Sequence, residues 1–348
     1  MTDKEKLYQL IQTAKPENIT LAIQLAEANK LHLHEYQDIQ EWFAEIKKQR
    51  FHAALLKEHL DDIAQKTHAY LNQLNLQNLP TTLGRLFNLE RLYLNNNQLK
   101  TLPESLKNLN ALTELNIGNN NISIFPSCIL DLQNLEDLTI SYNYLSFIPK
   151  SIGNLNKLRR LRLNYNQLES FPESARQLTN LHTLHLHHNR LKRMPRSLSY
   201  LPHLSSLDLS GNQLKQVPDY IDSFKQILQL SFSNNPIQTI SPFIGKLTAL
   251  EKLHLDQTAI QILPDSIGDL SQLKELYLFG NQLKSLPQSI GNLSQLKLLK
   301  LTANVGIQIP DTIGRLKNLK KLWLWDCELP EKEILRIKNL LPHCQVKH

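Results

Sequence analysis

A proline-centred motif returns every 23 residues through most of this chain, and no insertion or deletion disturbs the spacing. The repeat reads L-x-x-L-x-L-x-x-N-x-L-x-x-L-P-x-x-I-G-x-L-x-x-L, with a clean copy at residues 273–291. One copy cannot bury its apolar side chains alone, so neighbouring copies must stack. The period therefore predicts a solenoid. Its prolines are Pro80, Pro103, Pro126, Pro149, Pro172, Pro195, Pro218, Pro264, Pro287 and Pro310, with Ser241 in the one missing slot.

Each position of the repeat predicts a local structure. The alternating L-x-L stretch is typical of a short strand, whereas the proline and glycine of L-P-x-x-I-G favour a tight arc of turns or short 3₁₀ segments. The asparagine after the strand can bond to backbone groups that the turn leaves unpaired. Stacked repeats should therefore form an asparagine ladder, interrupted by Thr258 and Cys327. Its members are Asn97, Asn120, Asn143, Asn166, Asn189, Asn212, Asn235, Asn281 and Asn304.

The repeat resembles the leucine-rich-repeat family, specifically its 23-residue LPxxIG type. The resemblance covers about three-quarters of the chain. It implies an α/β horseshoe-shaped solenoid whose parallel sheet lines the concave side. We expect about 11 repeat units in residues 69–328.

Both ends of a solenoid need a cover, because each repeat is buried only by its neighbours. Residues 1–68 carry no repeat and have apolar residues at helical spacing, which predicts an N-terminal helical cap; a second binding module is the alternative. Pro330 should open a C-terminal cap helix in residues 329–348, with Glu331 and Glu333 in its first turn. The sparse cysteines Cys128, Cys327 and Cys344 argue against a disulfide framework.

The variable strand positions should face solvent on the concave side, where no packing requirement fixes them. Basic and acidic residues balance there, although the whole chain carries a net charge of +7. Because DNA and RNA binding needs a basic stripe on one face, we expect no nucleic-acid partner. Some of the excess charge forms a basic patch in the middle repeats, interpreted as a solvated surface or a steering surface for an acidic partner or membrane. It comprises Arg159, Arg160, Arg162, Arg176, Arg190, Lys192, Arg193 and Arg196.

An aromatic group near the C-terminal end is the strongest candidate for a binding site. Tyr277, Phe279, Trp323 and Trp325 should face outward on nearby repeats, with Lys300 on the strand between them. Exposed aromatic rings beside a cation are typical of protein-binding hot spots. The alternative is that the C-terminal cap packs over the two tryptophans. Further candidate partner-binding residues on the same face are Tyr93, Arg162, His185 and His187.

His185, His187 and Asp208 could form a metal-ligand set by residue type. Parallel side chains on a flat sheet converge poorly on one ion, so solvent-exposed polar contacts are the preferred interpretation. No phosphate-binding loop, dinucleotide fingerprint, nucleophile elbow or zinc-protease motif occurs in the sequence. We therefore expect neither an enzyme nor a cofactor; a metal-dependent or other enzyme using the His185 and Asp208 region is the alternative.

These patterns predict a monomeric scaffold that binds another protein on the concave face. No apolar stretch is long enough to cross a membrane, so a membrane partner is not expected. The charged N-terminal segment lacks the apolar core of a Sec signal peptide, which predicts a cytoplasmic protein or one translocated into a host cell. The composition is similar to that of repeat effectors injected by intracellular bacteria, and a bacterial cytoplasmic adaptor is the alternative.

Overall fold

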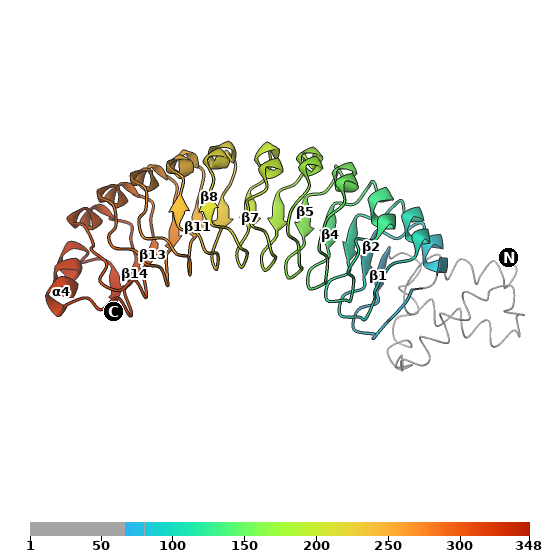
Figure 1. Cartoon of the computed structure of the whole chain (residues 1–348), viewed down its shortest axis with the longest axis horizontal. Helices are drawn as coiled ribbons and strands as arrows, with labels where there is room; N and C mark the ends of the chain where they lie inside the picture. The colour runs from blue at the N-terminus through green and yellow to red at the C-terminus, as the bar shows by residue number, and fades with distance from the viewer. Residues whose placement is uncertain (1–66, 80) are drawn as a thin grey trace, which may run out of the picture. The chain divides into compact units, whose positions relative to one another are not determined.

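A computed structural model describes residues 67–348 except residue 80, and it divides the chain into two compact units, Met1–Asn166 and Gln167–His348. Most of the predicted N-terminal helical cap, residues 1–66, lies outside the described residues. In both units the repeats run as predicted: a three-residue strand, a turn, and a 3₁₀ arc on the side away from the strands (Figure 1).

The first unit contains a parallel sheet with neighbouring strands in chain order. Equivalent residues of adjacent repeats pair with each other, for example Leu92 with Leu115 and Leu115 with Leu138. The strands are β1 (His68–Tyr70), β2 (Arg91–Tyr93), β3 (Glu114–Asn116), β4 (Asp137–Thr139) and β5 (Arg160–Arg162). The arcs are η3 (Thr81–Arg85), η4 (Glu104–Asn108), η5 (Ser127–Asp131) and η6 (Lys150–Asn154).

The second unit repeats this plan and ends in a helix and one further strand. Its sheet runs through β6 (Thr183–His185), β7 (Ser206–Asp208), β9 (Gln229–Ser231), β11 (Lys252–His254), β12 (Glu275–Tyr277), β13 (Leu298–Lys300), β14 (Lys321–Trp323) and β15 (Gln345–Lys347). The arcs are η7 (Glu173–Gln177), η8 (Arg196–Tyr200), η9 (Asp219–Ser223), η10 (Pro242–Lys246), η11 (Asp265–Asp269), η12 (Gln288–Asn292) and η13 (Asp311–Arg315). A separate two-stranded parallel sheet joins β8 (Gln216–Val217) to β10 (Thr239–Ile240).

Alternation along each strand separates the core from solvent. The middle residue, usually leucine, is buried: Leu92, Leu207 and Leu322 are each no more than 1% exposed. The first and third residues project to the opposite side, which we call the sheet face. Burying one strand leucine per repeat gives each repeat roughly 2 kcal/mol from that side chain alone.

The asparagine ladder is present where the sequence predicts it. In the second unit, the Oδ1 of Asn212 accepts from the backbone N–H of Leu191 at 3.0 Å. Its Nδ2 donates to the carbonyls of Leu186 and Leu209, both at 3.0 Å. One buried amide thus joins two repeats through their backbones.

The residue before each ladder position has a left-handed backbone, which the repeat pattern does not indicate. The φ angles of Tyr142, Tyr165 and His188 are 54°, 54° and 52°, and Gly211 and Gly280 occupy the same position in their repeats. L-residues adopt this region at a cost of about 1–2 kcal/mol. The turn therefore stores strain, and the ladder bonds that follow it help to hold the turn in place.

One repeat departs from the pattern at Gly306, which stands where most repeats have leucine. Its φ is 72°, and its N–H donates to the carbonyl of Cys327 at 2.9 Å. Ile307, one residue later, fills the core instead and is 1% exposed. The change is local, because Ile309 and Ile313 in the same repeat remain buried.

The C-terminal helix expected after Pro330 is α4 (Glu331–Leu340), which packs against η13. Ile334 and Ile337 on its inner side are buried. The three cysteines are free thiols. None of the helices in the described part of the chain is long and apolar enough to cross a membrane.

Candidate functional site

The sheet face of the second unit carries a group of aromatic rings and lysines near its C-terminal end. It contains Phe279, Lys300, Trp323, Trp325 and Lys347, which we call the Lys–aromatic cluster. Strands β13, β14 and β15 bring three of these residues together, because Lys300 pairs with Trp323 and Trp323 with Lys347. The other two extend the face just beyond the ends of β12 and β14.

Each lysine ammonium in the Lys–aromatic cluster lies over two rings. The Nζ of Lys300 is 4.8 Å from the ring centre of Phe279 and 5.3 Å from that of Trp323. The Nζ of Lys347 is 5.6 Å from Trp323 and 5.7 Å from Trp325. Such contacts contribute about 0.5–1 kcal/mol each at exposed sites. They fix the rings and the charges as one preformed surface.

Part of the Lys–aromatic cluster remains open to solvent. Trp325 is 41% exposed, and the two indole rings lie 5.5 Å apart. In the described part of the chain, neither Lys300 nor Lys347 forms an ion pair with a carboxylate, and the buried Nε1 of Trp323 has no acceptor. The alternative, a C-terminal cap over both tryptophans, describes this arrangement only in part: the tail extends the sheet beside Trp323 and adds Lys347 to the face, whereas Trp325 stays exposed.

Lys347 is the member that sequence reasoning missed. Its strand does carry the signal of a polar–apolar–polar triplet, Gln345-Val346-Lys347. However, Val346 pairs with Leu322, 24 positions earlier, so a search at the 23-residue period passes over it.

Tyr277 was predicted with these aromatics, but its side chain contacts the preceding strand and its own strand instead. Its ring stacks on His254 with 4.1 Å between ring centres, and its hydroxyl donates to Glu275 at 2.8 Å. Burial and the contact with Glu275 raise the pKa of the Tyr277 hydroxyl to about 12. Glu275 also forms an ion pair with Lys252, with 3.1 Å between Oε1 and Nζ. Tyr277 is therefore part of a neutralised network beside the Lys–aromatic cluster.

The histidine group lies on the sheet face at the other end of the second unit. His185 is the direct strand partner of Asp208, as expected, but the side-chain contact with the Asp208 carboxylate comes from His187, whose Nδ1 lies 3.1 Å from Oδ2. The N–H and hydroxyl of Ser210 also donate to Asp208 Oδ1, at 3.0 and 2.7 Å. Among the described residues, no group of three or more histidines, cysteines or carboxylates is placed to hold a metal ion.

These contacts predict a pH-dependent contribution from Asp208. Burial opposes its ionisation, but the contacts with His187 and Ser210 outweigh burial and lower the pKa of the carboxyl to about 2. Because this pKa is lower in the folded than in the unfolded chain, the ionised carboxylate stabilises the fold at pH values above its ordinary pKa. That stabilisation is lost as the pH falls toward 2. We expect Asp208→Asn to lower the free energy of unfolding by about 1–2 kcal/mol at pH 7.

Urea denaturation at pH 7, 5, 4 and 3 would measure this effect. The difference between the native chain and Asp208→Asn should be constant down to about pH 5 and shrink below about pH 4. Thr183→Ala, a substitution on the neighbouring strand, is a control that should show no such pH dependence. A difference that stays constant to pH 3 would show that the charge of Asp208 is not its source.

In the first unit, the two predicted candidate residues are held by neighbours on the sheet face. Tyr93 stacks on Tyr70 with 4.9 Å between ring centres. Arg162 donates to the buried carboxylate of Asp137 at 2.8 Å, and Arg160 donates to its other oxygen at 2.6 Å. Asp137 therefore holds Arg162 in place, but its single negative charge offsets only one of the two guanidinium charges. In the second unit, five members of the basic patch are exposed and form no ion pair with a carboxylate of the described residues: Arg176, Arg190, Lys192, Arg193 and Arg196.

Comparison with known proteins agrees with this geometry. The family model described as leucine-rich repeat region matches residues 54–232 and 227–341. A leucine-rich repeat protein of Leptospira interrogans is 31% identical, with a TM-score of 0.65; the match covers 84% of this chain and 87% of that one. An internalin of Listeria monocytogenes is 26% identical over 81% of this chain and 79% of its own, with a TM-score of 0.72.

A plant structure gives a third comparison. The Arabidopsis receptor kinase HAESA, solved in complex with the peptide hormone IDA and the co-receptor SERK1, is 30% identical over 74% of this chain. The match covers 49% of that chain, with a TM-score of 0.57. No curated protein matches the chain.

Proposed function

The chain belongs to the leucine-rich repeat family, and from this membership we propose that it is a non-enzymatic scaffold that binds another protein through the sheet face of its second unit. Proteins of this family typically serve as protein-interaction scaffolds. The observation that carries the proposal is the Lys–aromatic cluster, where two lysines and three aromatic rings form a surface that the core does not require.

The chemistry of the Lys–aromatic cluster suits a protein partner. Tryptophan is enriched at the centres of protein interfaces, where its large ring is desolvated and its position fixed. The ring contacts already hold Lys300 and Lys347, so little side-chain entropy is lost on binding. The lysines also favour a partner that presents carboxylates to this face.

Photo-crosslinking would identify that partner. A photoreactive phenylalanine analogue replaces Leu298, which lies on β13 at the sheet face, or Tyr200, which is exposed on η8. We expect a partner to be captured by the chain labelled at Leu298 and not by the chain labelled at Tyr200. Mass spectrometry of the captured complex then names the partner.

The double substitution Trp323→Ala and Trp325→Ala tests the anchor. We expect the affinity for the captured partner to fall by about 30-fold or more, since hot-spot truncations cost about 2 kcal/mol or more. Tyr200→Ala removes an exposed ring elsewhere and should leave affinity unchanged. Unchanged affinity in a folded double variant, judged by its circular dichroism melt, would contradict the role of these rings.

Where the chain acts is a separate proposal. We infer that it is a bacterial effector that works inside a host cell, because its composition is similar to that of injected repeat proteins and two similar structures are bacterial. A translocation reporter fused to the chain should give a signal in the host cytosol. A reporter signal confined to the bacterium would favour the adaptor alternative.

A further inference from the structure

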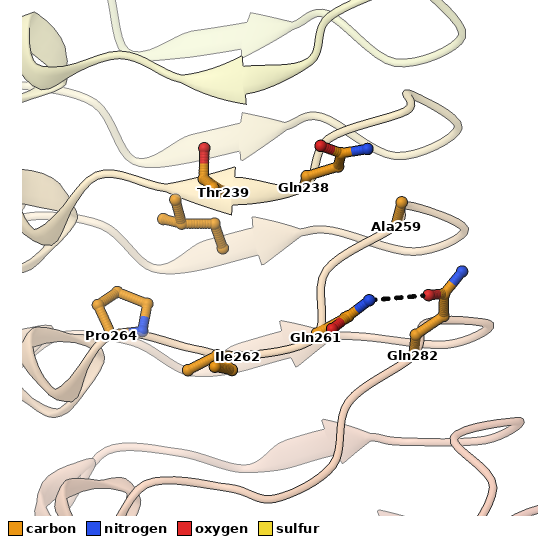
Figure 2. A pocket seen from close by; sticks show the side chains of 8 residues that line it. Gln238, Thr239, Ala259, Gln261, Ile262, Pro264 and Gln282 are labelled. Atoms are coloured by element: carbon orange, nitrogen blue, oxygen red, sulfur yellow. Dashed lines mark hydrogen bonds between the residues drawn. The ribbon is translucent and has the colours of Figure 1, made fainter.

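A groove of about 630 Å³ opens on the flank of the second unit, away from the sheet face. It lies between the segment containing β10 and the equivalent segment of the next repeat, as Figure 2 shows. Its lining residues are Gln238, Thr239, Ile240, Ala259, Gln261, Ile262, Pro264 and Gln282.

The groove coincides with a break in the asparagine ladder. In a regular repeat, the ladder amide accepts from a backbone N–H of the preceding repeat, as Asn235 does from Leu214 at 3.0 Å. Thr258 replaces that amide in the next repeat and is too short to reach back. Ile237 instead donates its N–H to the backbone carbonyl of Asn235, in its own repeat, at 2.8 Å. One of the bonds that ties these two repeats together is therefore missing.

The flank segments pair along their strands on both sides of this break. Across it, the N–H of Ala259 donates to the carbonyl of Ile237 at 2.8 Å, just before the strand positions. Before the break, β10 pairs with β8. After it, Lys284 donates its N–H to the carbonyl of Gln261 at 3.2 Å, and Gln308 donates to Lys284 at 2.9 Å. Among the described residues, no backbone bond joins Thr239–Ile240 to Gln261–Ile262. The outer edge of β10 thus has no strand partner.

The groove lining is uncharged and divided by polarity. Gln238, Gln261 and Gln282 supply amide donors and acceptors, and Gln261 bonds weakly to Gln282 at 3.4 Å. Ile262 and Pro264 supply an apolar wall, and Ile262 is 74% exposed, which is high for a large apolar side chain. In Figure 2 the amides lie toward one end of the groove and Pro264 and Ile262 toward the other.

We propose that this groove binds an extended, uncharged peptide segment of a partner protein, whose backbone pairs with the open edge of β10. A strand edge offers N–H and C=O groups in the pattern that only another extended backbone matches. The glutamine amides add backbone-like donors and acceptors, and Ile262 takes an apolar side chain of the peptide. The absence of lysine and arginine from the lining disfavours phosphate or nucleic acid here.

The proposal is tested with a phage-displayed library of random dodecapeptides, selected on the full chain carrying Trp323→Ala and Trp325→Ala. These substitutions disable the Lys–aromatic cluster, so the outcome does not depend on the proposed function of the sheet face. We expect enriched peptides with few charged residues. Synthetic versions should slow amide hydrogen exchange in residues 237–242, since an added strand protects the edge of β10.

Three substitutions should then abolish binding, each measured as at least a tenfold loss of affinity. Ala259→Arg and Ile262→Arg fill the groove, and both are compatible with the fold because Arg190 and Arg193 hold the same repeat positions elsewhere. Thr258→Asn restores the ladder amide and should draw the two repeats together while raising the melting temperature. Gln213→Arg, at the Ala259 position two repeats earlier, is the control and should bind normally.

Several outcomes would overturn the proposal. These are a library that yields no peptide sensitive to Ala259→Arg, and peptides that leave exchange in residues 237–242 unchanged. Enrichment of acidic peptides that resist all three substitutions would likewise place the binding surface elsewhere.

Discussion

Replacing Asn212 with alanine is expected to lower the free energy of unfolding by about 3 kcal/mol. The substitution removes the acceptor for the backbone N–H of Leu191, which is left buried without a partner. The carbonyls of Leu186 and Leu209 suffer less, because Asn189 and Asn235 also donate to them. The largest part of the loss therefore comes from one orphaned N–H, with a smaller part from the hydrogen bonds lost at the carbonyls.

Two comparison variants separate this effect from simple truncation. Gln213→Ala changes the exposed neighbour and should alter the free energy by less than about 0.5 kcal/mol. Asn212→Cys should fall between the native chain and Asn212→Ala, since the Cys327 thiol keeps one of the ladder bonds, to Leu301 at 3.3 Å. Urea denaturation followed by circular dichroism gives the free energies of unfolding of the native chain and these variants, and so their order of stability. Equal stability of Asn212→Ala and Gln213→Ala would show that the ladder bonds are not stabilising.

Gly291→Ala is expected to destabilise the chain by about 2–3 kcal/mol through overpacking of the 3₁₀ arcs. An alanine Cβ at this position would lie 2.4 Å from the backbone carbonyl oxygen of Thr312 and 2.8 Å from the Thr312 Cβ. Backbone atoms of the next arc cannot rotate away, so η12 and η13 must separate. Without that clash, the change should stabilise by about 0.4–1 kcal/mol, because alanine loses less backbone entropy on folding.

Gly314→Ala provides the matched control one repeat later. There the nearest atom to an added Cβ is the carbonyl oxygen of Leu340, at 3.2 Å, in α4. We expect a change of less than about 1 kcal/mol in either direction. Thermal melts of the two variants make the comparison. If both glycines tolerated alanine equally, close approach of the arcs would not explain the glycine of the repeat.

The fold was predictable because every repeat has the same pattern of apolar, asparagine and proline positions. Leu92, Leu115 and Leu138 occupy one position of the period, and burying them all requires the strands to align in parallel and in register. The proline of a regular repeat likewise stands directly before a 3₁₀ arc, as Pro103 does before η4. These outcomes depend on local sequence and stacking, which a single period encodes.

The candidate site was only partly predictable, because it depends on departures from the period. The periodic pattern placed Trp323 and Lys300 side by side on the sheet face, but it missed Lys347, whose strand is offset by one residue. The pattern also placed His185 beside Asp208 without showing that His187 makes the contact. That choice depends on side-chain rotamers, which alternation along a strand does not specify.

The groove beside β10 was missed for a similar reason. The sequence shows Thr258 as an interruption of the ladder, and in the structure its hydroxyl donates to the carbonyl of Leu255 at 3.4 Å. The sequence did not show that in the preceding repeat the backbone N–H of Ile237 loses its bond to a ladder side chain. The effect of a ladder substitution appears one repeat before the substituted residue.

The strand that closes the sheet determines how this protein can be handled at the bench. Lys347 lies in β15 and contacts both tryptophans, and a purification tag or fluorescent protein joined to His348 would begin two residues beyond Lys347. Such a fusion would sit beside the Lys–aromatic cluster and compete with an incoming partner. A polyanionic or aromatic tag would be the worst choice, and internal labelling at an exposed arc such as η8 would leave the surface accessible.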